Sequence, residues 1–126
     1  MNPLTQGELD QFRGGDEKYA HWLRRLVYSE GVYYMAERAG AHWLIDIVAS
    51  YQMHKKVKNN KRLQEFQLWE LKVKTDKNGG KSAVVTLRED TGEPVVIRQK
   101  IEYTDFPLDY IKLYVEGGTL LLPSEH

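Results

Sequence analysis

The sequence predicts an α+β protein in which N-terminal helices pack on one face of a C-terminal, five-stranded antiparallel sheet in meander order. Apolar residues recur with the spacing of an α-helix over residues 29–51, and they alternate with polar residues through most of the second half of the chain. An antiparallel sheet with one apolar face needs a covering layer, which the preceding helices can supply. We therefore expect a single domain over residues 1–126, with a helical part at 1–58 and a sheet part at 63–123.

The composition excludes several classes of protein. Apolar residues make up 41% and charged residues 29% of the chain, which is typical of a globular protein and excludes wholesale disorder. Without cysteine there is no disulfide, no thiolate zinc site and no cysteine nucleophile. Eighteen basic residues balance eighteen acidic ones, so a charged partner must be bound by a local patch. No apolar run approaches the ~20 residues that span a bilayer, and the N-terminus lacks signal-peptide features, so we expect a cytoplasmic protein with no membrane partner.

Three helices are expected, each from a start signal or an apolar stripe. The first, at residues 5–12, begins with a capping box and ends at a Gly-Gly pair. Ser29 can cap a second helix at 30–39, which Gly40 ends in a left-handed conformation, and a third helix covers 41–55. The helix residues expected in the core are Val32, Met35, Leu44, Ile47, Val48 and Tyr51.

Residues 19–28 fit two interpretations. Trp22, Leu23 and Leu26 share one face of a helix, whereas alternate residues over 24–28 fit a strand. We favour an irregular extended segment or a short strand.

Five strands are expected after the helices because apolar and polar residues alternate between turn signals. Asn78-Gly79-Gly80 is typical of a hairpin turn, and the segment 104–107 (TDFP) interrupts the pattern because proline cannot donate to a ladder. The predicted strands cover residues 65–74, 82–88, 95–103, 111–116 and 119–122.

Segments spread over nearly the whole chain resemble an uncharacterised family of small proteins from bacterial, plasmid and phage genomes. They are YSEGV…AE at 28–37, AGAHWLID at 39–46, EFQLW at 65–69, YTDFPL at 103–108 and LLPSE at 121–125. The resemblance implies a stand-alone accessory protein that a mobile element can carry, rather than a housekeeping enzyme. By analogy with such small proteins we expect it to bind another macromolecule, and inhibition of a host defence protein is one function that the analogy includes.

Polar and aromatic residues on the outward faces form the first candidate site. Exposed tyrosines suit protein interfaces, although tyrosines that only rim the core would give the same pattern. A histidine with a carboxylate one helical turn later could be a general base or half of a metal site, but a solvated helix face is the interpretation we favour. The candidate interaction residues are Tyr33, Tyr34, His42, Asp46, Tyr110 and Tyr114.

A basic segment at residues 54–62 is the second candidate site. It carries five cations and no acid, and we expect it to be a helix end that leads into an exposed loop. The cations could bind phosphates while Tyr51 and Trp69 stack on bases, although plain solvated surface is the more common role of such a loop. The candidate nucleic-acid-binding residues are Lys55, Lys56, Lys58, Lys61 and Arg62.

The sequence therefore favours a non-enzymatic protein that binds a protein partner or self-associates. No nucleotide-binding or hydrolase signature is present, and we expect no catalytic residues, metal or cofactor. The alternative is a nucleic-acid-binding protein that uses the basic 54–62 loop.

Overall fold

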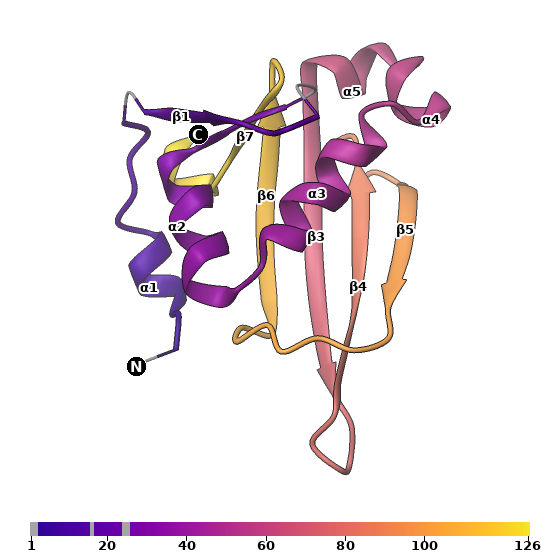
Figure 1. Cartoon of the computed structure of the whole chain (residues 1–126). Coiled ribbons are helices and arrows are strands. Elements are labelled where there is room, and N and C mark those ends of the chain that lie inside the picture. Colours follow the sequence, from indigo (N-terminus) through magenta and orange to yellow (C-terminus); the bar gives the residue numbers. More distant parts are fainter. Residues whose placement is uncertain (1–2, 16, 24–25) are drawn as a thin grey trace.

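The protein consists of a mixed β-sheet with two central helices packed on one of its faces (Figure 1). The computed structural model describes residues 3–15, 17–23 and 26–126. The helices are α1 (Gln6–Leu9), α2 (Glu30–Ala39), α3 (His42–Tyr51), α4 (Lys55–Lys58), α5 (Lys61–Glu65) and a final 3-10 turn, η1 (Pro123–Glu125). The strands are β1 (Lys18–Ala20), β2 (Val27–Ser29), β3 (Phe66–Thr75), β4 (Lys81–Arg88), β5 (Val95–Ile101), β6 (Tyr110–Glu116) and β7 (Thr119–Leu121).

Within the described residues, the sheet has seven strands in the order β1-β2-β7-β6-β3-β4-β5. The pairing of β2 with β7 is parallel, and all the other neighbouring pairs are antiparallel. The α+β class is confirmed, but the predicted five-stranded antiparallel meander with N-terminal helices is wrong. The helices α2 to α5 lie in the middle of the chain, between the short hairpin β1–β2 and the strands β3 to β7.

Two physical causes explain the error. The strands β1 and β2 have three residues each, which is too short for a period of two to be visible in the sequence. The chain also crosses from β5 back to β6, which pairs with β3 rather than with its predecessor (Figure 1). Apolar β3 and β6 thus become central strands, and alternation within a strand carries no information about its neighbour.

Capping residues in the sequence correctly predicted where several helices begin or end. The Thr5 hydroxyl accepts a hydrogen bond from the Glu8 amide, and that of Ser29 accepts one from the Val32 amide. Gly40 ends α2 with φ 60°. The first helix is shorter than predicted, and residues 24 and 25 of the ambiguous segment 19–28 lie outside the described residues.

The predicted third helix and the basic loop are divided differently in the structure. The helix α3 ends at Tyr51, and His54 caps the separate turn α4 by accepting a hydrogen bond from the Lys56 amide. Asn60 caps α5 in the same way through the Leu63 amide. The segment 54–62 is therefore mostly two short helices rather than a loop.

The core lies between α2, α3 and the inner face of the sheet. Ile45 is fully buried where the sequence predicted Ile47, which is only partly buried, and Tyr51 is also partly buried. The tyrosine hydroxyl donates to the Gln99 amide oxygen of β5, so this side chain needs polar surroundings at its tip. The largest buried side chains of the inner sheet face are Trp69, Leu71, Leu87, Ile111, Leu113 and Leu120.

A buried carboxylate ties the C-terminus to the start of α2. Glu125 of η1 accepts hydrogen bonds from the Ser29 hydroxyl, from the Gly31 amide at 3.1 Å and from the Leu122 amide at 3.0 Å. Gly31 is required there, because an added Cβ would lie 2.7 Å from a Glu125 oxygen and 2.7 Å from a Leu122 methyl carbon. We call Ser29, Gly31 and Glu125 the polar clamp, and it fixes the junction of β2 and α2.

Candidate interaction surface

Aromatic side chains from four elements meet on the helix-bearing side of the molecule. Tyr19 and Tyr28 lie opposite each other in the β1–β2 hairpin, and their rings stack with centroids 5.7 Å apart. Tyr33 of α2 also stacks on Tyr19, with centroids 4.3 Å apart and planes 12° apart. His42 of α3 meets Tyr33 edge-on at 6.3 Å. We call these four residues, with Trp22 of the hairpin loop, the hairpin surface.

The chain brings these rings together by local means. Ser29 is both the last residue of β2 and the N-cap of α2, so the chain passes from strand to helix without a loop. Tyr28 and Tyr33 are therefore held on two rigid elements only five positions apart. The cross-strand pair Tyr19–Tyr28 then places a third ring beside them, as facing side chains of an antiparallel pair do.

Hydrogen bonding, burial and nearby carboxylates raise the pKa values of these tyrosines. A hydrogen bond to Glu37 raises the pKa of Tyr33, and the charge of Glu37 adds to this shift. Burial raises the pKa of Tyr28, with further contributions from Asp46 and Glu37. Glu37 also lies 3.8 Å from His42 Nε2. The phenols therefore remain neutral hydrogen-bond donors at neutral pH, beside carboxylates that accept.

Asp46 is paired with His21 and not with His42. His21 Nε2 lies 2.7 Å from an Asp46 oxygen, while His21 Nδ1 accepts a hydrogen bond from the Leu23 amide at 3.1 Å. In the neutral ring, Nδ1 is therefore the acceptor and Nε2 the donor. With both nitrogens occupied, the buried His21 positions the hairpin loop instead of acting as a free base.

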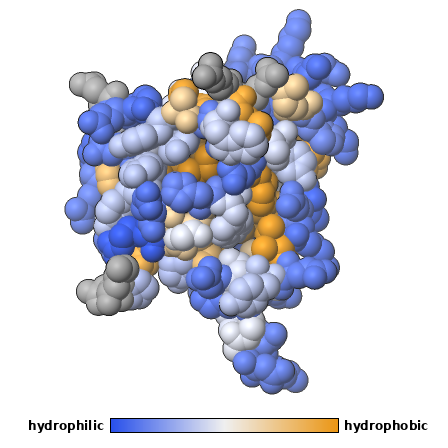
Figure 2. All heavy atoms as spheres, viewed as in Figure 1, coloured by the Kyte–Doolittle hydropathy of each residue, from blue (hydrophilic) through white to orange (hydrophobic). Residues whose placement is uncertain are grey.

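Trp22 projects from the hairpin loop with 75% of its surface exposed, and the adjacent Leu23 is 36% exposed. The Trp22 ring lies 5.4 Å from the His21 ring. Tryptophan is one of the side chains most enriched in protein interfaces, because it buries a large area at a small entropic cost. Figure 2 views this side of the molecule, where hydrophobic residues and residues of intermediate hydropathy occupy the middle and hydrophilic ones the edges.

Tyr34 lies apart from the hairpin surface, on the side of α2 that faces α1. Its hydroxyl donates to the Glu8 carboxylate, which also binds Arg38, and its ring packs 5.1 Å from Phe12. The same hydrogen bond raises the pKa of Tyr34 and lowers the pKa of Glu8. Tyr34 therefore anchors α1 to α2.

Tyr110 and Tyr114 lie on the opposite face of the sheet, and α2 and α3 both lie on the other face (Figure 1). In β6 they alternate with the buried Ile111 and Leu113. The Tyr110 hydroxyl donates to Glu70 of β3. The six residues predicted as one interaction surface thus occupy three separate places: Tyr33, His42 and Asp46 together, Tyr34 alone, and Tyr110 with Tyr114.

The predicted basic residues lie on α4 and α5. Arg62 forms an ion pair with Glu89 at 2.9 Å, and Glu93 lies 3.9 Å away. Lys55, Lys56, Lys58 and Lys61 are exposed. Trp69 is buried under the helices and cannot stack on a base beside them, which removes one reason for expecting nucleic acid there.

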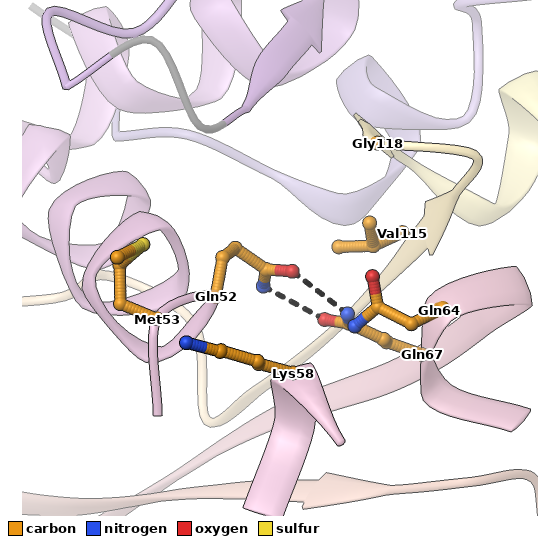
Figure 3. A pocket seen from close by; sticks show the side chains of 7 residues that line it. All are labelled: Gln52, Met53, Lys58, Gln64, Gln67, Val115 and Gly118. Carbon is orange, nitrogen blue, oxygen red and sulfur yellow. Dashed lines mark hydrogen bonds between the residues drawn. The ribbon is translucent and has the colours of Figure 1, made fainter. Parts of the chain in front are cut away.

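A pocket of about 340 Å³ opens between the end of α3, the helices α4 and α5, and the β6–β7 turn (Figure 3). Gln52 and Gln67 face each other across it and exchange two hydrogen bonds, of 2.9 and 2.8 Å. Gln67 also donates to the Leu63 carbonyl and accepts from Trp69 Nε1, so its amide group is fully satisfied. This arrangement joins α3 to β3 and leaves the buried amide no free group for a ligand.

No group of three or more histidine, aspartate or glutamate side chains suited to a metal ion occurs among residues 3–15, 17–23 and 26–126. Within the same part of the chain, none of the helices has the length and apolar character needed to cross a membrane.

Sequence reasoning missed Tyr19, Tyr28 and Trp22 as members of the hairpin surface. The interpretation of 19–28 as extended already contained the necessary signal, because two short strands around a loop form a hairpin with facing side chains. The stacking of Tyr33 on Tyr19 had no such signal, because it depends on how α2 packs against β1.

The whole chain matches one family model. This model, described as a family of unknown function (DUF6876), matches residues 3–126, and the chain therefore belongs to that family. The comparisons with curated proteins and with solved structures found no match.

Proposed function

We propose that this member of the DUF6876 family is a non-enzymatic accessory protein that binds another protein through the hairpin surface. The observation that carries the proposal is the exposed Trp22 in the loop of the hairpin whose two strands carry Tyr19 and Tyr28, two of the three stacked tyrosines. Tryptophan has a large apolar surface, so burying the exposed Trp22 side chain in a pocket of a partner would contribute strongly to the free energy of binding. The earlier resemblance to proteins of plasmids and phages adds the proposal that the partner is a host protein, such as one used in defence.

The rigidity of the surface supports binding. Tyr19, Tyr28 and Tyr33 are carried by a strand pair and a helix, and they hold one another by stacking. The Asp46–His21 hydrogen bond fixes the base of the Trp22 loop. Side chains that are ordered before binding lose little conformational entropy on association.

The chemistry of the surface favours a partner that presents lysine or arginine. The exposed Glu37 and Asp46 can accept hydrogen bonds from such a cation, and the tyrosine rings attract it through their π faces. We therefore propose a partner with a basic segment, with Trp22 as the hydrophobic anchor next to it.

The proposal can be tested by comparing the wild-type protein with Trp22→Ala and Tyr33→Ala in affinity capture from host lysate. We expect wild type to recover a defined protein, and each variant to bind that purified protein at least about thirtyfold more weakly in biolayer interferometry, as loss of a hot-spot side chain does. Tyr103→Ala is the matched control, because Tyr103 is 76% exposed and lies outside the hairpin surface.

Equal binding by Trp22→Ala, Tyr33→Ala and wild type would reject the hairpin surface as the site. Light scattering distinguishes binding to a second copy of the chain from binding to a different protein. A stable dimer lost in Trp22→Ala would assign the surface to self-association, whereas a monomer that recovers no protein from lysate would contradict the proposed function.

A further inference from the structure

The outer face of the sheet concentrates positive charge. It is formed by every second residue of the adjacent strands β6, β3, β4 and β5, which are the residues that alternate with the buried core positions. Among them Glu70 and Glu116 are the acids. The cations of this face, which we call the outer sheet face, are Lys72, Lys74, Arg88, Arg98, Lys100 and Lys112.

The strand register arranges these cations in rows across the sheet. Lys72 lies beside Val84, which in turn lies beside Lys100. In the next row Thr86 of β4 lies between Glu70 of β3 and Arg98 of β5. Arg88 is occupied by an ion pair with Glu70 at 3.2 Å. Lys72, Arg98 and Lys100 are exposed and form no ion pair within the described part of the chain, so they are free to bind a ligand.

A groove of about 370 Å³ is lined by the cations Lys72, Lys74, Arg88 and Arg98, and Thr86 also lies among the residues that line it. Thr86 is only 5% exposed, and its hydroxyl has no hydrogen-bond partner among the described residues. A buried hydroxyl without a hydrogen-bond partner is unfavourable, because it has lost its hydrogen bonds to water. An oxygen-rich ligand in the groove would supply the missing hydrogen bond.

Aromatic rings border the cations. Tyr110 is 41% exposed, and Lys112 lies over the ring of Tyr114 at 5.8 Å. Tyr114 also packs against Phe66 and His126, each with a ring centroid 5.0 Å away. Cations next to accessible rings on a sheet are the combination that binds phosphates and unpaired bases at once.

We propose that the outer sheet face binds single-stranded nucleic acid, with Lys72, Arg98 and Lys100 on the phosphates and the exposed Tyr110 against a base. A duplex would leave the rings unused, because its bases are already stacked. A second copy of this chain would bring one set of cations against another. An acidic protein would match the charge but would not need the exposed rings.

The test is fluorescence anisotropy with a labelled oligothymidylate of about 15 nucleotides, a length that covers one such sheet. We expect binding that weakens steeply between about 50 mM and about 200 mM salt. The triple variant K72E/R98E/K100E should bind at least about tenfold more weakly, and its log–log salt slope should be shallower by about 2, because single-stranded nucleic acid contributes about 0.7 per phosphate contact. Tyr110→Ala should weaken binding by about tenfold through the loss of one base stack.

K55E/K56E/K58E is the matched control, because it makes the same change in charge on α4 and should bind as wild type does. Circular dichroism checks that each variant is folded, and the neutral variant K72Q/R98Q/K100Q should show an intermediate loss. The proposal is overturned if K72E/R98E/K100E retains wild-type affinity or if the α4 variant alone loses binding. It is also overturned if a duplex of the same sequence or poly-glutamate binds as tightly as the single strand.

Discussion

The hairpin surface and the outer sheet face are built from the same kind of side chain in opposite electrostatic surroundings. On the hairpin surface, Tyr33 and its neighbours lie beside the carboxylates of Glu37 and Asp46. On the outer sheet face, Tyr110 donates to the Glu70 carboxylate and Lys112 lies over the Tyr114 ring, but the face as a whole carries six cations and two acids. The tyrosines supply contact area in both places, and the charges around them set the kind of partner.

The difference shows how little a net charge says about binding. The chain has 18 basic and 18 acidic residues, which suggests no preference for any charged partner. Alternation along β3 to β6 places six of the cations on one face of the sheet. Folding therefore creates a local charge that the sum over the chain conceals.

The two regions also differ in what holds them in place. The hairpin surface depends on the polar clamp, in which one carboxylate satisfies three donors at the junction of β2 and α2. The outer sheet face is the back of a long antiparallel ladder over an apolar core. Removing one member of a buried polar network leaves the other members without hydrogen-bond partners. A single substitution in a long strand ladder leaves most of the backbone hydrogen bonds of the ladder in place. The regions should therefore respond differently to substitution.

The largest effect is expected from Glu125→Ala. The change leaves the Ser29 hydroxyl and the amides of Gly31 and Leu122 without a buried partner, and it should lower the free energy of unfolding by about 3 kcal/mol. Urea denaturation measures this loss. Hydrogen exchange should show faster opening of residues 27–32 than of β3, which would separate the two regions.

Gly31→Ala tests the same clamp sterically, because the added methyl group displaces Glu125. Gly7→Ala is its control, since an added Cβ there meets its nearest neighbour at 3.9 Å and alanine favours the helix. Equal stability of Gly31→Ala and Gly7→Ala would contradict the role of the clamp.

A smaller loss of stability is expected from Gln67→Leu. This substitution should destabilise the hairpin surface and the outer sheet face together. Gln67 is 1% exposed and joins α3 to the central strand β3, and its loss leaves Trp69 Nε1 and the Gln52 amide unsatisfied. We expect a loss of about 2 kcal/mol in the free energy of unfolding, measured by urea denaturation. Gln64→Leu makes the same chemical change at an exposed position of the same pocket, where only the hydrogen bond to the Val57 carbonyl is lost, and it should cost less than about 1 kcal/mol. A larger loss in Gln64→Leu than in Gln67→Leu would reject the structural role of the amide pair.

The smallest effect is expected from Glu8→Gln, and it should depend on pH. The Tyr34 hydrogen bond is the largest cause that lowers the pKa of Glu8 below 4.5, and Arg38 adds to it. A carboxyl group whose pKa is lower in the folded than in the unfolded protein stabilises the fold above its unfolded pKa, and this stability is lost as the pH falls through the folded pKa.

Thermal unfolding should therefore give a lower Tm for Glu8→Gln than for wild type at neutral pH, and the two values should converge in acid. Asp10→Asn is the control. The Asp10 side chain accepts its hydrogen bond from Gln6 of the same helix, α1, and this hydrogen bond does not join α1 to α2. A constant difference in Tm between Glu8→Gln and wild type at every pH would contradict the assigned hydrogen bond.

Features that depend only on neighbouring residues could be predicted from the amino-acid sequence. Ser29 and Gly40 marked the ends of α2, and the alternation after residue 65 marked β3 to β7. It also placed Tyr110 and Tyr114 on the face opposite the core. Caps and periods act over a few residues, so their cause is visible in the local sequence.

Features that join distant segments of the chain depend on the tertiary structure and could not be predicted from the local sequence. The parallel pairing of β2 with β7 joins Val27 to Thr119, and the polar clamp joins Ser29 to Glu125. The stacking of Tyr33 on Tyr19 and the rows of cations on the outer sheet face also depend on which elements become neighbours. The order of strands is set by the total burial of apolar surface and the pairing of buried polar groups, and both are properties of the whole chain.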